Sequence, residues 1–286
     1  MIEAHNLSFR YGRRSRWIVS DLTVSTSPGE ILAVLGPNAR GKTTLLKCLS
    51  GLLEPTSGTV SSDGHVAYVP QGQGAGSAFP AIDLVLMGRA RHVGVLRVPG
   101  KKDREIAMDA LERIGIAHLA DRRFGSMSGG ERQMVLIARA LAGGSQTIVL
   151  DEPASALDLR NQRQVLTALR TLADEGMSVV MTTHHPDHAL QVAERCLLLE
   201  NADDIRTGPT PQLLTRETLS ELYRMPVYIA DIPLPGYGRT ITVPDFGRSV
   251  NGRSVNDRSD SGRSDSGTGP TPASDNAQPE PGGSPL

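Results

Sequence analysis

The sequence is poor in cysteine and aromatic residues, and neither sign of charge dominates it. Its 286 residues include two cysteines and 3% aromatic residues, and 30 basic against 31 acidic residues leave a formal net charge of −1. Cys48 and Cys196 stand far apart without metal-like spacing, which fits small buried side chains in a reduced cytosolic protein better than a disulfide framework. The balanced charge excludes a global field that would draw the chain to nucleic acid or anionic lipid.

Long apolar runs are also missing. No stretch approaches the roughly 20 apolar residues that a membrane-crossing helix needs. The N-terminal residues 1–5 are not a basic region followed by an apolar one, as a secretory signal would be. We therefore expect contact with a membrane to come through a partner protein.

The last part of the chain has very few large aliphatic residues. From residue 248 onward they are Val250, Val255 and Leu286, and the pentad GRSVN occurs at both 247–251 and 252–256. Such a composition cannot offset the entropy of ordering by burial. It predicts a disordered low-complexity tail over residues 247–286, whose arginines either remain solvated or touch a membrane or a partner.

Upstream of this tail, short apolar runs alternate with segments of helical period, which predicts an α/β domain over residues 1–246 with helices covering a sheet. Residues 31–35, 148–150 and 178–182 read as buried parallel strands. The region from about 83 to 143 has helical periodicity and little strand character. We expect it to form a helical subdomain inserted into the α/β core.

A phosphate-binding loop is predicted at residues 36–43. The sequence GPNARGKT fits G-x-x-x-x-G-K-[ST], follows a strand and precedes a helical run, which is the context the motif requires. Backbone N–H groups would surround phosphate oxygens, Lys42 would reach the β- and γ-phosphates, and Thr43 would hold Mg²⁺. The alternative is a glycine turn before an ordinary helix. The nucleotide contacts expected in this segment are Gly36, Pro37, Asn38, Ala39, Arg40, Gly41, Lys42, Thr43 and Thr44.

Two adjacent acids, Asp151 and Glu152, follow the second predicted strand. Burying them is costly unless the site uses them. Asp151 is placed to hold Mg²⁺, directly or through water, and Glu152 to polarise the attacking water as general base. An acidic cap on a strand is the alternative, which the phosphate loop upstream disfavours.

A turn of small residues, Ser128-Gly129-Gly130, opens another helical segment. A helix N-terminus of this kind binds anions, although a plain serine cap would look similar. Its context, MSGGE at residues 127–131, resembles the LSGGQ signature of ATP-binding cassette (ABC) proteins, and the resemblance extends over roughly residues 1–240. It implies a P-loop NTPase of the ABC cassette fold, with ATP and Mg²⁺ as its ligands.

The resemblance assigns further residues. It implies that Tyr11 stacks on adenine, that Gln71 senses the γ-phosphate and contacts the metal, and that Asp158 lies in the loop that crosses a dimer. Of the adjacent histidines 184 and 185, the family's spacing selects His184 as the switch histidine. The implied catalytic set is Lys42, Gln71, Glu152 and His184. Many ABC proteins have glycine at the position of Ala39, where a positive φ would cost alanine about 1 kcal/mol.

The resemblance also implies partners. Two copies of the chain would face head to tail, so that the Ser128–Gly130 turn of one closes over ATP on the Lys42 loop of the other. The dimer would sit on integral membrane permease subunits at the cytoplasmic face of the cell membrane, as a peripheral protein. An extracytoplasmic substrate-binding protein would act only indirectly. No nucleic acid partner is expected, since neither a long coiled-coil insertion nor a second cassette is present.

Residues 83–92, DLVLMGRARH, resemble the importers of iron–siderophore, haem, cobalamin and molybdate or tungstate, as does the segment 214–227. This predicts an importer ATPase for a metal chelate, cobalamin or a molybdate-type oxyanion; an exporter ATPase or a soluble regulatory ABC ATPase is the alternative. Arg89, Arg91, His92, Lys101 and Lys102 form a basic stretch, which we expect to face either the permease and lipid headgroups or solvent.

Overall fold

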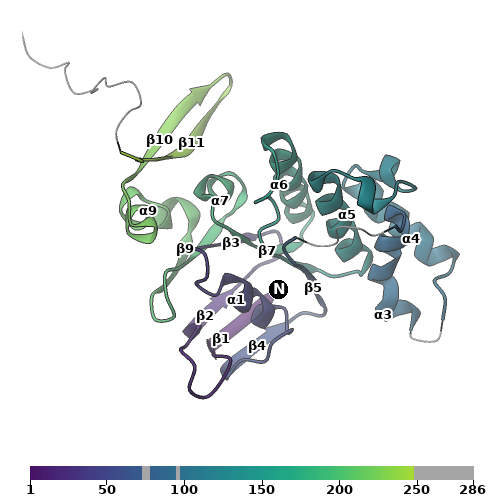
Figure 1. Ribbon diagram of the computed structural model, residues 1–286, viewed down its shortest axis with the longest axis horizontal. Helices are drawn as coiled ribbons and strands as arrows, with labels where there is room; N and C mark the ends of the chain where they lie inside the picture. The colour runs from purple at the N-terminus through teal and green to yellow at the C-terminus, as the bar shows by residue number, and fades with distance from the viewer. Residues whose placement is uncertain (73–77, 95–96, 248–286) are drawn as a thin grey trace, which may run out of the picture. The chain divides into compact units, whose positions relative to one another are not determined.

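A six-stranded sheet is the framework of the molecule, in the order β5-β6-β7-β3-β8-β9 (Figure 1). The computed structural model describes residues 1–72, 78–94 and 97–247. Neighbouring strands from β5 to β8 are parallel, and β9 runs antiparallel to β8. The strands are β3 (Ile31–Leu35), β5 (Val66–Val69), β6 (Thr147–Leu150), β7 (Ser178–Thr183), β8 (Arg195–Leu199) and β9 (Ile205–Pro209).

The three predicted strands are confirmed, with β6 beginning and β7 ending one residue beyond the expected bounds. Every residue of β3, β6 and β7 is buried, as expected of parallel strands that are covered on both faces. The side chains alternate: Ile31, Ala33 and Leu35 enter one core, whereas Leu32 and Val34 enter the other. The sheet therefore separates two hydrophobic cores.

Helices cover one face of this sheet. Among the described residues of 81–142 the chain forms helices and turns and contributes no strand to the sheet. Helix α4 packs on α2 and α5, and Figure 1 shows α4 beside α5. The segments are α2 (Ala81–Leu86), η1 (Met87–Arg89), α3 (Ala90–Val93), α4 (Lys101–Arg113), η2 (Ala117–Leu119), η3 (Phe124–Ser126) and α5 (Gly129–Ala142). After β6, α6 (Leu159–Asp174) joins the same core.

A second sheet covers the opposite face. It has three antiparallel strands in the order β2-β1-β4, which are β1 (Ile2–Phe9), β2 (Val19–Ser25) and β4 (Ser57–Ser62). Together with α1 (Lys42–Leu49) it encloses the second core. Cys48 in this core and Cys196 in the other are both buried and free, as predicted.

Arg89 belongs to the interior of the helical layer. Its Nε lies 3.1 Å from Asp103 Oδ1 and its Nη1 donates to the Ala142 carbonyl at 3.0 Å, so it joins η1 to α4 and to the end of α5. His92 adds a contact of 2.9 Å from Nε2 to the Gly143 carbonyl. The expectation that Arg89 faces a permease, lipid or solvent is wrong, because its guanidinium group makes its hydrogen bonds to α4 and to the end of α5.

The C-terminal part contains α7 (Pro186–Val192), α8 (Thr210–Leu213), α9 (Arg216–Tyr223) and a hairpin of β10 (Val227–Leu234) and β11 (Tyr237–Pro244). Residues 1–246 form one compact unit. Apart from Gly247, the predicted tail lies outside the described residues. None of the helices in the described ranges is long and apolar enough to cross a bilayer.

Candidate nucleotide-binding site

The site lies where neighbouring parallel strands end. The loop after β3 carries residues 36–41, Gln71 follows β5, Asp151 and Glu152 follow β6, and His184 follows β7. Because these strands are parallel neighbours, their carboxyl ends meet at one edge of the sheet, which is where open α/β sheets bind ligands. The structure thus brings together predicted residues that are more than a hundred positions apart in the chain.

The loop between β3 and α1 has two residues with positive φ, a glycine and an alanine. Gly41 has φ 96° and caps α1, and a Cβ on it would stand 2.2 Å from Ile18 Cγ2, so a side chain is excluded there. Ala39 has φ 62°, the left-handed conformation anticipated for it, which costs an alanine about 1–2 kcal/mol. The amide groups at the start of α1 provide a partial positive charge beside this loop.

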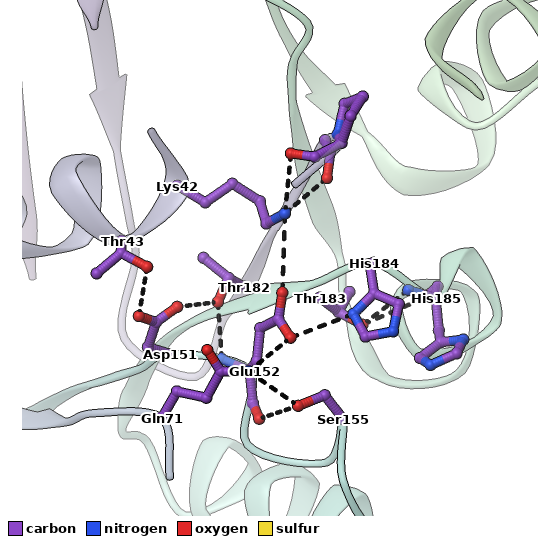
Figure 2. A network of polar contacts seen from close by, with 12 residues as sticks. Lys42, Thr43, Gln71, Asp151, Glu152, Ser155, Thr182, Thr183, His184 and His185 are labelled. Carbon is purple, nitrogen blue, oxygen red and sulfur yellow. Dashed lines mark hydrogen bonds and ion pairs between the residues drawn. The ribbon is translucent and has the colours of Figure 1, made fainter. Parts of the chain in front are cut away.

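Lys42 crosses the loop with a buried ammonium group. Its Nζ donates to the carbonyl of Gly36 at 2.7 Å and to that of Pro37 at 3.2 Å, and it lies 3.8 Å from Glu152 Oε1. Burial lowers the pKa of Lys42, and the nearby carboxylates of Glu152 and Asp151 oppose that shift. The Lys42 ammonium group is therefore held between the phosphate loop and Glu152 (Figure 2).

Asp151 accepts hydrogen bonds from two threonines. Thr43 Oγ1 donates to Asp151 Oδ2 at 2.6 Å, and Thr182 Oγ1 donates to Asp151 Oδ1 at 2.7 Å. Hydroxyl and carboxylate oxygens are hard ligands of the kind Mg²⁺ takes. Among the described residues there is no group of three His, Cys, Asp or Glu that would hold a metal alone. A cation beside Thr43 and Asp151 would therefore need phosphate and water oxygens as well, which is how Mg²⁺ commonly binds.

Glu152 is surrounded by groups from separate strands. Its Oε2 accepts from Gln71 Nε2 at 3.1 Å and lies 3.2 Å from His184 Nδ1, as Figure 2 shows. The residue has φ 46°, an uncommon value for glutamate that is typical of strain at functional sites. Its N–H donates to Thr182 Oγ1 at 2.7 Å, which holds this backbone in place.

Thr182 is a site residue that the sequence did not single out. It is fully buried at the end of β7, and one hydroxyl accepts from Glu152 N while donating to Asp151. The available signal was a Thr-Thr pair that follows the apolar run of a buried strand just before His184. A polar side chain in such a place must find partners.

The neighbouring histidines differ in their surroundings. The His184 side chain faces Glu152, and the His185 ring lies 4.0 Å from it, centre to centre. His188 packs beneath, 3.3 Å from Thr183 Oγ1, and burial lowers the pKa of His188 to about 4. Of the histidines in this loop, the one chosen by the family's spacing is the one that contacts the acidic pair. Gln71 contacts Ser155 Oγ at 3.4 Å as well as Glu152, and its role at a metal stays a prediction.

A cavity of about 450 Å³ lies beside the phosphate loop. It is lined by Ile18, Asn38, Ala39, Gly41, Lys42, Thr43, Thr44, Gln71 and Glu152. Tyr11 stands outside this lining; the residue is 65% exposed, and its hydroxyl is 3.1 Å from Thr44 Oγ1. Arg40 is half-buried in the same loop.

The remaining predicted residues, Ser128–Gly130 and Asp158, do not line this cavity. Ser128 caps α5, accepting from Glu131 N at 3.2 Å. Asp158 caps α6 by accepting from Asn161 N at 2.8 Å. A Cβ on Gly130 would stand 2.4 Å from Asn161 Cγ, so the turn needs glycine to pack against the start of α6. These residues form a second polar surface within the same chain.

Fold and site together define a P-loop nucleoside triphosphatase, and comparison with known proteins defines it further. The ABC transporter family model matches residues 19–155. The chain is 41% identical over 228 residues to the molybdate import ATP-binding protein MolC of Haemophilus influenzae, covering 79% of this chain and 89% of that protein. The chain belongs to the ABC transporter family, as an ATP-binding subunit that hydrolyses ATP.

Solved structures agree with this assignment. One, described as a metal-chelate type ABC transporter in an inward-facing conformation, is 39% identical, with a TM-score of 0.80 over 85% of this chain and 96% of that one. Another is an ATP-binding cassette solved as a dimer with ADP and phosphate after hydrolysis; it is 25% identical, with a TM-score of 0.62 over 73% of this chain and 99% of that one. The predicted cassette fold is confirmed.

Substitution of Thr182 tests the bridge between the two acids. Thr182→Val keeps the shape of the side chain but leaves Glu152 N and Asp151 Oδ1 without their buried partner, which should cost about 1–3 kcal/mol of unfolding free energy. We also expect ATP hydrolysis to fall, while Thr182→Ser, which retains the hydroxyl, should keep most of both. Urea unfolding and phosphate release measure the two effects. Normal stability and turnover of the valine variant would contradict the bridge.

Proposed function

We propose that this chain is the ATP-hydrolysing subunit of an ABC importer, bound as a dimer to permease subunits at the cytoplasmic face of the membrane. The observation that carries the hydrolytic role is the single network that joins Lys42, Glu152 and His184 (Figure 2). The 41% identity to a molybdate import protein supports import over the exporter and regulatory alternatives.

ATP would bind along the phosphate loop. Lys42 already has its ammonium beside the loop carbonyls, 2.7 Å from Gly36 O, and we assign it to the β- and γ-phosphates. The backbone N–H groups among residues 38–44 would hold the phosphate oxygens, since α1 begins there with its positive end toward them. The exposed ring of Tyr11, tethered to Thr44, is assigned to the adenine face.

Thr43 and Asp151 would hold Mg²⁺, with Gln71 as a further candidate ligand. The Thr43 hydroxyl donates to Asp151 Oδ2 at 2.6 Å, so these two oxygen ligands of the kind that Mg²⁺ takes lie next to each other. The ion would neutralise charge on the β- and γ-phosphate oxygens during transfer.

Glu152 is assigned as the general base. It accepts a proton from the attacking water through a carboxylate that Gln71, His184 and Lys42 hold in one orientation. Positioning of this kind contributes to catalysis because the reacting groups need not reorient during the reaction. His184 would then stabilise the charge that develops on the γ-phosphate.

A second copy would complete the site. Ser128–Gly130 and Asp158 lie outside the cavity that Lys42 lines, so a nucleotide in that cavity would meet them only from another subunit. The start of α5, with its glycine backbone, suits the approach of a phosphate. The dimeric cassette with ADP and phosphate supports this arrangement.

The helical layer is the part we assign to the permease, with its boundaries at about residues 83–143. β5, which precedes Gln71, contacts α5 of this layer, so we propose that movement at the nucleotide would reach these helices. The cargo class we propose is a metal chelate, cobalamin or a molybdate-type oxyanion, delivered by an extracytoplasmic binding protein. The similarity to a molybdate import protein and to a metal-chelate type transporter supports this range.

Glu152→Gln separates nucleotide binding from hydrolysis. The variant keeps the shape and removes the base, so Mg²⁺-ATP should still bind and the closed dimer should accumulate. Hydrolysis should fall by a factor on the order of 10²–10⁴. Lys42→Ala should instead weaken nucleotide binding and ATP-driven dimerisation together. Size-exclusion chromatography with and without ATP, with phosphate release, distinguishes them; turnover at the normal rate in Glu152→Gln would refute the assigned base.

Ser128→Arg tests the contribution of the second subunit. A bulky cation at the turn should block closure over ATP while leaving binding at Lys42 intact, because the turn does not line that cavity. We expect ATP affinity close to that of the parent and strongly reduced turnover. If the purified variant hydrolysed ATP normally, the composite site would be wrong.

Transport direction is tested with the assembled complex. The chain purified from solubilised membranes should bring an integral membrane protein with it. Proteoliposomes of that complex, loaded with ATP, should accumulate labelled molybdate or a ferric chelate supplied outside with its binding protein, and a Glu152→Gln complex should not. Loss of cargo that is enclosed together with ATP would identify an exporter instead.

A further inference from the structure

The loop that carries His184 is held from the C-terminal end of the chain. Tyr223, the last residue of α9, donates its hydroxyl to the His184 carbonyl at 3.1 Å. Burial raises the pKa of the Tyr223 phenol, so the group remains a protonated donor at any working pH. A residue 39 positions downstream thus fixes the backbone of the switch histidine.

A second contact lies on the other side of the same loop. Thr242, on β11, donates to Asp187 Oδ1 through its N–H at 2.7 Å and through its hydroxyl at 3.0 Å. Asp187 belongs to the first turn of α7, which begins directly after the loop. The chain between His184 and Asp187 is therefore tied at both ends to elements beyond residue 215.

These elements are themselves anchored. Leu219 and Leu222 of α9 are buried in the larger core, and Val227 N donates to Ser220 Oγ at 2.9 Å, which joins α9 to β10. From Val227 to Leu234, β10 pairs with β11. We call this unit, α9 with the β10–β11 hairpin, the C-terminal brace.

The C-terminal brace could affect hydrolysis because the loop that it holds places His184 beside Glu152. His184 Nδ1 lies 3.2 Å from Glu152 Oε2, and a displacement of the His184 backbone would change that distance directly. Within the loop, His185 N, which shares a peptide unit with the His184 carbonyl, donates to Thr183 Oγ1 at 3.1 Å, so this peptide unit is held at both its N–H and its C=O. The Tyr223 hydroxyl is the contact that this peptide unit receives from the C-terminal brace.

We infer that Tyr223 is a positioning residue for His184, and that the C-terminal brace sets the rate of ATP hydrolysis by holding the switch loop. This inference rests on the proposed role of His184 in hydrolysis. It assigns a task to a segment that lies outside the matched family region of residues 19–155. A brace that only stabilised the fold would leave the chemistry of correctly folded protein unchanged.

The test uses the full chain with Tyr223→Phe, which removes one hydroxyl and keeps the ring. We expect kcat for ATP to fall about three- to tenfold, the effect of losing one hydrogen bond, with KM for ATP unchanged because the Lys42 loop is not touched. Tyr228→Phe is the matched control. It makes the same change on β10, where Tyr228 is 41% exposed and the Arg216 guanidinium lies over its ring, and this variant should hydrolyse ATP normally.

A double-mutant cycle with His184→Ala identifies the route of the effect. If Tyr223 acts through His184, adding Tyr223→Phe to His184→Ala should cause no further loss in single-turnover hydrolysis. Melting temperature and circular dichroism, measured on every variant, establish that the protein compared is folded.

Each other result overturns the inference in a distinguishable way. Normal kcat in Tyr223→Phe, with slow hydrolysis in His184→Ala, would make the brace purely structural and leave the proposed function standing. Additive losses in the double variant would show that Tyr223 acts elsewhere. Normal hydrolysis in His184→Ala would remove the role proposed for that histidine, and the inference with it.

Discussion

Parallel pairing of β6, β7 and β3 is the constraint on which the site depends. In-register parallel strands end together, so Lys42 after β3, Asp151 and Glu152 after β6 and His184 after β7 meet without any long loop to place them. The backbone of Glu152 is strained in this arrangement: it has φ 46°, and its carboxylate lies beside Lys42 of the phosphate loop. The Thr182 hydroxyl holds that turn, and two hydrophobic cores hold the sheet.

The parts that sequence predicted are those with a local signature. Continuous apolar runs marked β3, β6 and β7, since a strand buried on both faces has little room for polar residues, and the glycine and lysine spacing marked the loop before α1. Thr182 and Tyr223 escaped notice because their importance comes from partners brought close by folding. The same reason made the interpretation of Arg89 wrong: its partners, Asp103 and the Ala142 carbonyl, depend on how three helical segments pack. The choice of His184 over His185 as the switch histidine came from the family's spacing alone.

The residues predicted to contact the nucleotide lie on two separate surfaces of the chain. One surrounds the cavity with Lys42 and Gln71; the other is the turn at Ser128 where it packs on the start of α6. Each helix of the second surface has its own cap, Ser128 for α5 and Asp158 for α6, so these termini are stable without a nucleotide. Because the backbone N–H groups at these helix ends have hydrogen-bond partners within the chain, a partner subunit can approach or leave this surface without leaving them unpaired.

The hydroxyl of Thr182 links Asp151 and Glu152 with a definite polarity, because it donates to the first and accepts from the second. Hydrogen bonds in such a chain polarise one another. More negative charge on Asp151 strengthens donation by the hydroxyl, which makes its oxygen a better acceptor and tightens its hold on Glu152 N. A cation that draws charge from Asp151 has the opposite effect and slackens that hold. The charge on Asp151 thus affects how firmly the backbone N–H of Glu152 is held, through a residue on the neighbouring strand.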